Sequence, residues 1–375
     1  MLLAAICGRS RRWLAACVPL GLTAGIGLAA ATHWYIKDQG LAEDRVPHAL
    51  WVCIGATGLA AVVVVVGWRG ARWWRRSVSV VAVPICALST LLTLNNWVGY
   101  APTVGSAWDR MTGRPLPGLI DQARVEALQH QGAAPNWKTI VKVHIPDAAS
   151  GFEHRDELVI LPPAWYASTP PPPLPVVMMI GGEFGQPADW LYAGNAQQTI
   201  NDFAAGHDGN APVLVFPDYS GTFSNDTECV NGTRGNAADH LTKDVVPYLI
   251  ANFGVSANAA DWGVVGWSSG GTCALTLAVT HPELFGAFVD IDGQLGPNAG
   301  TKQQTIARLF GGDAAAWAAF DPRTVIVNHG LYNDMSAWFS VSVDTPTVYR
   351  LPADTEPPAP SDARESSSVA TTIPR

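Results

Sequence analysis

Positive charge is scarce beyond residue 100. Nine Lys and Arg outnumber three acids in residues 1–100, so this segment carries +6, and residues 101–375 carry −14, of a net charge of −8. Proteins that bind nucleic acids need a basic surface for the phosphates. The acidic balance therefore excludes nucleic acid as a partner of the larger part of the chain.

Charge of either sign is absent from three long apolar runs. Residues 13–36 contain no Lys, Arg, Asp or Glu, residues 49–68 include "GLAAVVVVVGW", and residues 78–94 read "VSVVAVPICALSTLLTL". About 20 apolar residues cross a bilayer, so we expect three transmembrane helices within residues 1–100. The arginine clusters "GRSRRW" and "WRGARWWRR" favour the cytoplasmic side. This predicts a multi-pass protein of the cell membrane, with everything after residue 100 outside the cytoplasm.

Cysteine is rare outside the apolar runs. Cys229 and Cys273 are the only two after residue 100. Disulfides persist outside the cytoplasm, so these two residues either form a bridge or remain separate buried thiols. The Cys and His spacings are not those of a metal site, and we discount the short acidic run "SNDTEC" as a calcium site. We therefore expect no metal and no cofactor.

Short apolar segments alternate with helical patterns after residue 140. The expected strands are "WKTIVKVHIP", "DELVILPP", "VVMMIGG", "APVLVFPD", "DWGVVGW", "GAFVDIDG" and "PRTVIVNHG", and the expected helices are "DHLTKDVVPYLIANFG" and "GTCALTLAVTHPELF". This order predicts a mostly parallel sheet with helices on both faces. We expect a linker over residues 101–140, an α/β domain over 141–351 and a disordered tail over 352–375, where Pro, Ser and charges dominate.

The segment "GWSSG" places Ser268 between two glycines, after a predicted strand and before a predicted helix. This G-x-S-x-G pattern in that context is typical of a nucleophilic serine, because a cramped turn lifts the hydroxyl above the sheet edge. The N-terminal amides of the helix then face the charge that develops on a reacting carbonyl. The backbone N–H groups of Ser269 and of Glu183, in the loop after "VVMMIGG", are the candidate oxyanion donors.

One region resembles a known family. The order of helix, strand, serine turn and "HPELFG" in residues 244–293, "DVVPYLIANFGVSANAADWGVVGWSSGGTCALTLAVTHPELFGAFVDIDG", resembles the esterase D-like α/β-hydrolases. Among them it is similar to the antigen 85-type mycolyltransferases of mycobacterial envelopes, and the resemblance extends over about residues 157–334. It implies an α/β-hydrolase fold, Ser268 as nucleophile, and an acid in the loop after the next-to-last strand. Asp334, in "NHGLYNDMSAW", is the first candidate for this acid, Asp292 the second and Asp321 the third.

Histidine is missing where this fold needs it. The triad order is Ser, acid, His, yet none of the nine histidines follows Asp334, so we expect the last strand and closing helix to be missing. Three readings stay open: a truncated or frame-shifted product, a substitute such as His329 at the end of a predicted strand, or a non-catalytic domain. A serine without a positioned base is a poor nucleophile at neutral pH.

The sequence therefore predicts a membrane-anchored, extracytoplasmic serine esterase or acyltransferase. Its substrate would be a carboxylic ester, such as a lipid or glycolipid (mycolyl) ester, attacked through an acyl-serine intermediate. The alternative is a catalytically impaired or non-enzymatic envelope binding protein that retains the hydrolase fold without a triad histidine.

Overall fold

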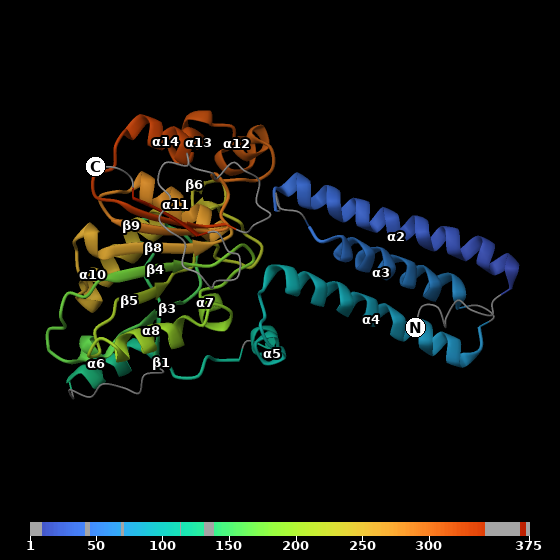
Figure 1. The fold of residues 1–375 in the computed structure, drawn as a ribbon, viewed down its shortest axis with the longest axis horizontal. Helices are drawn as coiled ribbons and strands as arrows, with labels where there is room; N and C mark the ends of the chain where they lie inside the picture. The colour runs from blue at the N-terminus through green and yellow to red at the C-terminus, as the bar shows by residue number, and fades with distance from the viewer. Residues whose placement is uncertain are drawn as a thin grey trace. The chain divides into compact units, whose positions relative to one another are not determined.

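Two compact units, Met1–Ala101 and Pro102–Arg375, make up the chain in the computed structural model (Figure 1). The described residues are 10–41, 46–68, 71–112, 114–130 and 139–341, together with the backbone of 368–372.

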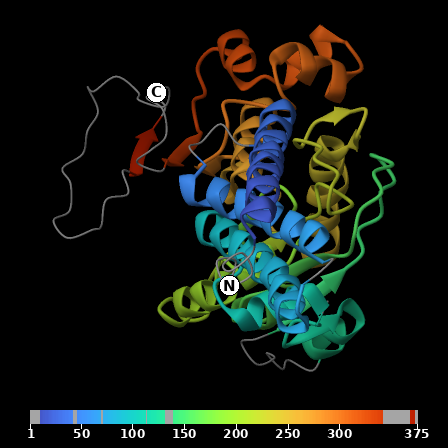
Figure 2. The same ribbon diagram turned by 90° about the vertical axis from the view of Figure 1, so that its right-hand side faces the viewer.

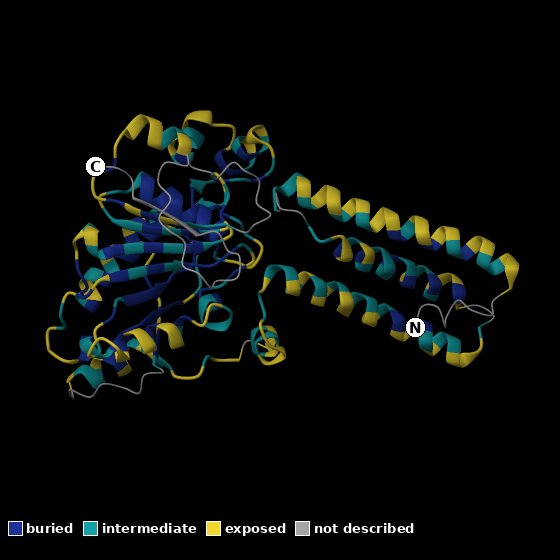
Figure 3. Ribbon diagram, in the orientation of Figure 1, coloured by how far each residue is buried: buried dark blue, intermediate teal, exposed yellow. Residues whose placement is uncertain are grey.

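The first unit consists of three long helices, α2 (Arg11–Gln39), α3 (His48–Gly67) and α4 (Trp73–Val98). Ser10 caps the start of α2 by accepting a hydrogen bond from the backbone of Trp13, and Gly40 ends it in the left-handed conformation that suits glycine. All three helices are long and apolar enough to cross a membrane, and they match the runs expected from the sequence. Many residues of α2 and α4 are exposed, whereas most residues of α3 are intermediate or buried (Figure 3).

Small residues join α2 to α3. A Cβ added to Gly25 would lie 2.4 Å from the carbonyl oxygen of Gly55, and one added to Gly58 would lie 3.0 Å from the Cα of Gly25. The two helix backbones are therefore in direct contact along a glycine seam, which we define as Gly25, Gly55 and Gly58. Such close approach of small residues is the usual way in which helices associate in lipid.

A mixed sheet forms the centre of the second unit. Its order is β1-β2-β3-β5-β4-β8-β9-β10-β11, and β5, β4, β8, β9 and β10 run parallel to one another. The strands span Leu119–Asp121 (β1), Ile140–Val143 (β2), Glu157–Ile160 (β3), Val176–Ile180 (β4), Val213–Phe216 (β5), Trp262–Trp267 (β8), Ala287–Ile291 (β9), Ser336–Ser340 (β10) and Ser368–Thr372 (β11). The expected mostly parallel α/β sheet is confirmed.

Helices cover both faces of this sheet. Leu249 and Phe253 of α10 (Val246–Phe253) and the apolar residues of α11 (Ser269–Thr280) pack in the main core, whereas Ile200 of α8 (Ala196–Ala205) packs in a second core on the opposite face. Figure 3 shows the buried strands between these layers. Alternate residues of each strand point to opposite faces, so the short, wholly apolar strands of the sequence serve both cores.

The remaining elements of the second unit are short. They are α5 (Val104–Thr112), α6 (Gln122–His130), η1 (Pro163–Tyr166), α7 (Asp189–Tyr192), β6 (Asn231–Gly232), β7 (Gly235–Asn236), α9 (Ala237–Asp239), the π-helical turn η2 (His240–Val245), η3 (Ala259–Asp261), α12 (Lys302–Phe310), α13 (Ala314–Phe320) and α14 (Pro322–His329).

The strand expected at 322–330 is wrong, because this segment forms α14. The Asp321 carboxylate accepts a hydrogen bond from the backbone N–H of Thr324 at 2.9 Å, and Pro322 occupies the first helical position. Both features favour a helix start. Only one side of the apolar run is used, because Val325 packs against the core while Val327 is exposed. A run of branched apolar residues therefore did not predict a strand correctly in this segment.

Two other expectations need correction. Part of the expected linker 101–140 belongs to the sheet, because Leu119–Asp121 pairs with β2 in parallel. Within the expected disordered tail 352–375, Ser368–Thr372 forms β11, antiparallel to β10 (Figure 2). The predicted absence of a last strand and closing helix concerns residues after 341, most of which lie outside the described part of the chain.

Candidate active site at the carboxyl edge of the sheet

Ser268 occupies a strained turn between β8 and α11. Its backbone has φ 56° and ψ −127°, a conformation that non-glycine residues rarely adopt and that concentrates at functional sites. The side chain is exposed. A Cβ on Gly266 would lie 1.9 Å from the carbonyl oxygen of Gly270, and one on Gly270 would lie 2.3 Å from that of Gly181. Only glycine fits on either side, as expected for a nucleophile turn.

Ser269 begins α11 directly after the turn. Its backbone N–H belongs to the first helical turn, where amides have no acceptor within the helix. Its buried side-chain hydroxyl lies 2.9 Å from the hydroxyl of Tyr219. The side chain is therefore held away from Ser268, and its backbone amide is the group available to a ligand at the turn.

The loop after β4 lies beside the same turn. The register pairs Ile180 with Gly266, so the residues that follow on both strands run alongside each other. A Cβ on Gly182 would lie 3.4 Å from the Cβ of Ser268, and Glu183 is the next residue. The structure thus brings Ser268, Ser269 and Glu183 together at the carboxyl edge of the parallel strands, where ligands of α/β proteins bind.

Two acidic residues lie at the carboxyl end of the neighbouring strand β9, Asp290 within the strand and Asp292 directly after it. The buried Asp290 accepts a hydrogen bond from the backbone of Gly293 at 2.8 Å, and burial raises its pKa to about 7. Asp292 is exposed and has φ 49°. Ser268 donates its backbone N–H to the carbonyl of Ile291 at 2.8 Å, which places Asp292 next to the serine turn in the sheet.

Asp334 lies at the opposite edge. It precedes β10, whose first residue Ser336 pairs with Ala287 at the start of β9, whereas Ser268 follows the end of β8. A five-residue strand is about 13 Å long, so the sheet itself separates Asp334 from Ser268. The prediction placed Asp334 after a strand that does not exist. The first acid after β10 in the sequence is Asp344, which lies outside the described residues.

His329 also lies away from Ser268. It ends α14, not a strand, and its ring stacks on that of Tyr332 with centroids 4.0 Å apart. The hydroxyl of Tyr332 donates to the carbonyl of Val279, near the end of α11. His329 was predicted as a substitute base because it was expected at the carboxyl end of a strand. This expectation is wrong, since the residue ends a helix. Asp321, the third acid candidate, caps α14.

A group of buried carboxyls lies beside the loop after β4. Burial raises the pKa of Glu183 to about 8, with a further rise from the charge of Asp226 and an opposing effect of Arg234. Burial also raises the pKa of Glu228 well above its ordinary value, and the charges of Asp226 and Glu183 add to this. A carboxyl that burial keeps neutral can donate a hydrogen bond as well as accept one. The run "SNDTEC", discounted as a calcium site, contains Asp226 and Glu228.

Cys229 and Cys273 form a disulfide, with their Cα atoms 5.4 Å apart. The bridge, one of the two alternatives left open by the sequence, is thus confirmed. Cys273 lies five residues after Ser268 in α11. The disulfide therefore ties the carboxyl-bearing loop that contains Glu228 to the helix that begins at the nucleophile turn.

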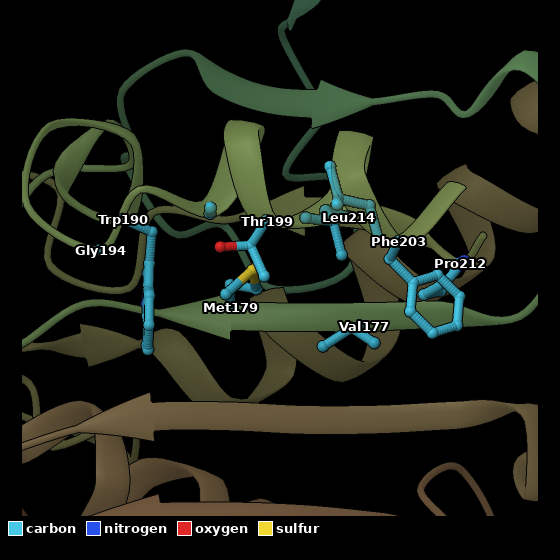
Figure 4. A pocket seen from close by; sticks show the side chains of 10 residues that line it. Val177, Met179, Trp190, Gly194, Thr199, Phe203, Pro212 and Leu214 are labelled. Carbon is cyan, nitrogen blue, oxygen red and sulfur yellow. The ribbon is translucent and has the colours of Figure 1, made fainter. Parts of the chain in front are cut away.

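An apolar pocket of about 300 Å³ opens between α8 and the sheet. Figure 4 shows Met179 and Val177 of β4 on its floor, with Trp190 at one end and Phe203 towards the other. The indole N–H of Trp190 donates to the carbonyl of Ile180, the last residue of β4. The Trp190 end of the pocket therefore lies towards the edge of the sheet that carries Ser268.

Among the described residues, three donors are placed to hold a metal: His154, Glu157 and His240, with one ligand atom of each within 4.8 Å of the others. Sequence spacing did not reveal them, because Glu157 and His240 are 83 residues apart.

The esterase family model matches residues 153–341. The chain belongs to this esterase family. The match contains the serine turn, the loop after β4 and the parallel core of the sheet, and together with this topology it identifies an α/β-hydrolase fold.

The chain is also similar to a curated relative and to several solved structures. The chain is 34% identical over 251 residues to an uncharacterized protein of Corynebacterium glutamicum, a match that covers 64% of this chain and 57% of that protein's length. It thus spans little more than half of this relative.

S-formylglutathione hydrolase of Agrobacterium tumefaciens is 19% identical, with 50% of this chain and 70% of that chain covered and a TM-score of 0.40. MPT51 of Mycobacterium tuberculosis is 20% identical, with 50% and 70% covered and a TM-score of 0.33. Likenesses at these scores carry no argument about activity.

Proposed function

We propose that this chain is a membrane-anchored serine esterase or acyltransferase that acts on a carboxylic ester outside the cytoplasm. The conformation of Ser268 carries the proposal. Ser268 is exposed and has a φ of 56°, and the glycines on either side of it leave no space for a side chain. Strained backbone conformations of this kind are found mainly at functional sites. Membership of the esterase family supports the same reaction class.

The reaction would proceed in two steps. The hydroxyl oxygen of Ser268 bonds to the ester carbonyl carbon as its proton passes to a base, and the carbonyl oxygen becomes an oxyanion near the amides of Ser269 and Glu183. The alcohol then leaves with a proton, and an acyl-serine remains. Water or a sugar hydroxyl next attacks the acyl group, which frees Ser268 and gives either an acid or a new ester. Amides aimed at the oxyanion contribute the largest part of such catalysis.

Among the described residues, no histidine is placed as a base for Ser268. In the described part of the chain, no hydrogen bond joins the hydroxyl of Ser268 to a histidine. An oxyanion site and substrate binding alone still give about 10³–10⁴-fold acceleration over water. We therefore propose slow turnover for this chain, with Asp292 as the acid nearest in the sheet to the serine turn.

The apolar pocket supports a lipid or glycolipid ester as substrate. Its lining is almost wholly apolar and its volume of about 300 Å³ suits a hydrocarbon segment, since ligand pockets begin at about this size. The Trp190 end lies towards the serine edge, so an acyl chain attached at Ser268 can be directed along β4. Three apolar helices and the arginine clusters beside them support a membrane anchor with the hydrolase unit on the outer side.

A non-enzymatic envelope protein is the second candidate. It is favoured by the positions of His329, at the far edge of the sheet, and of His240, which is buried against Glu157. Such a protein would bind an ester or lipid at the same edge without turning it over.

A fluorophosphonate probe separates the two candidates, because it labels a serine only where the hydroxyl is activated, whatever the substrate. We expect the full chain in detergent to be labelled and to hydrolyse a p-nitrophenyl ester, and Ser268→Ala to lose both signals. Ser336→Ala, an exposed serine at the opposite edge of the sheet, serves as the matched control. Equal labelling and hydrolysis in wild type and Ser268→Ala would leave only the binding protein.

A further inference from the structure

Three side chains distant from Ser268 converge in the interior of the second unit. Glu157 begins β3 and His240 begins the π-helical turn η2, and neither side chain has any exposed surface. The Nε2 atom of His240 lies 2.9 Å from Oε1 of Glu157. The ring of His154, in the loop before β3, stacks on that of His240 with centroids 4.1 Å apart. Two imidazoles and one carboxylate thus share one small volume.

The other nitrogen of each imidazole is already held by an oxygen. Nδ1 of His154 lies 2.9 Å from the carbonyl oxygen of Arg155, and Nδ1 of His240 lies 3.4 Å from Oδ2 of Asp244. Asp244 is itself fixed, because its Oδ1 accepts the backbone N–H of Ala149 at 2.9 Å. Both ring nitrogens of His240 thus face a carboxylate oxygen. An oxygen acceptor at Nδ1, as in both rings here, is the usual arrangement around histidines that bind a metal through Nε2.

One carboxylate oxygen in this group has no partner. Oε1 of Glu157 receives the backbone N–H of Asp218 at 3.2 Å and faces His240. In the described part of the chain, the buried Oε2 of Glu157 makes no hydrogen bond. An unpartnered anionic oxygen in the protein interior is strongly unfavourable, so it points to a ligand that the polypeptide itself does not supply.

Charge leads to the same conclusion. Glu157 and Asp244 carry two negative charges, and His240 can offset only one of them. The nearby Arg155 is engaged by Asp218, at 2.7 Å. A dication bound by neutral imidazoles would balance both carboxylates. Buried charges in proteins are paired or coordinate metals.

We propose that His154, Glu157 and His240 bind a divalent metal ion, and that zinc is the ion that this donor set fits. Two histidines and one glutamate are an established zinc ligand set, which leaves a fourth position for water. Two ligands each about 2.0 Å from a tetrahedral zinc are about 3.3 Å apart, so the 2.9 Å between His240 and Glu157 needs to open only slightly.

The position of the site indicates a structural role, because it lies away from Ser268. Strands β5 and β4 separate β3 from β8, a distance of about 14 Å at the usual strand spacing, so the metal does not touch the ester at Ser268. It joins the start of β3 to the turn from which α10 begins. π-Helical turns such as η2 are frequent at functional sites, and here the turn places His240 and Asp244 on the same side.

Zinc binding to the full chain in detergent tests the proposal, with purification through a tag that contains no histidine. After treatment with a chelator and addition of zinc chloride, we expect one zinc per chain by elemental analysis. At zinc concentrations about 100-fold above Kd, we expect Tm to rise by about 5–10 °C.

His154→Ala should lower zinc affinity at least about tenfold while the zinc-free Tm changes little, because His154 is only partly buried. Glu157→Gln, which keeps the shape of the side chain, should also abolish the zinc-dependent rise. His144→Ala is the matched control, since its exposed ring stacks on His154 from the outside with centroids 5.3 Å apart. A folded wild type that binds no stoichiometric zinc, or a His154→Ala variant that binds zinc as tightly as His144→Ala does, would overturn the proposal.

Discussion

The disulfide between Cys229 and Cys273 allows a quantitative prediction of stability. It closes a loop with a sequence separation of 44 residues, and the chain entropy that such a closure removes from the unfolded state is worth about 4 kcal/mol. For a domain of this size, each kcal/mol corresponds to about 2–4 °C in Tm. We expect the double variant Cys229→Ala/Cys273→Ala to unfold about 8–16 °C below the wild type.

Thermal unfolding followed by circular dichroism in detergent is the assay, with the wild type measured both oxidised and after reduction. Cys86→Ala, at a free cysteine of α4, controls for the exchange of cysteine for alanine and should leave Tm unchanged. The reduced wild type should approach the double variant. A double variant that melts within about 2 °C of the oxidised wild type would refute the loop-closure reasoning.

Two further variants test the active-site region. Gly270→Ala places a methyl group 2.3 Å from the carbonyl oxygen of Gly181, so we expect loss of fluorophosphonate labelling and about 1–3 kcal/mol of stability. Gly105→Ala, in an open position of α5, should change neither, and equal effects of the two would contradict the packing argument. Burial is the main cause that raises the pKa of Glu183 in the folded state from 4.5 to about 8. The folded state therefore binds the proton of this carboxyl more tightly than the unfolded state does. Stability from this group is therefore full below pH 4.5 and is lost as pH rises towards 8. Between pH 5 and pH 8.5, Tm should fall less in Glu183→Gln than in the wild type, by an amount equivalent to a few kcal/mol of unfolding free energy. An unchanged fall in Tm would show that other groups cause the pH dependence.

The parallel core could be predicted from the sequence because its signals are local. Runs such as "VVMMIGG" and "DWGVVGW" are too short for helices and too apolar for surface strands, and the glycines around Ser268 are needed by the turn itself. The same local reasoning failed at 322–330, where three branched apolar residues suggested a strand. A helix cap at Asp321 and the proline after it decided the structure, and the error moved Asp334 and His329 to the wrong edge.

Long-range contacts could not be predicted in the same way. Folding brings together His154, Glu157 and His240, because β3 pairs with β5 and His240 of η2 contacts Glu157. Their spacing in the sequence therefore does not predict the cluster. The carboxyls of Glu183 and Glu228 are likewise joined by folding alone. Burial raises the pKa values of both carboxyls. It is a property of the folded chain, so composition alone does not predict it.

The glycine seam between α2 and α3 has a mechanical consequence. Since Gly25, Gly55 and Gly58 meet main chain to main chain, no layer of side chains separates the two helices at this seam, and they cannot easily slide or tilt against each other there. We therefore expect the two helices to move as one rigid hairpin. The three glycines themselves carry no ionisable group, so the packing at the seam should not depend on pH.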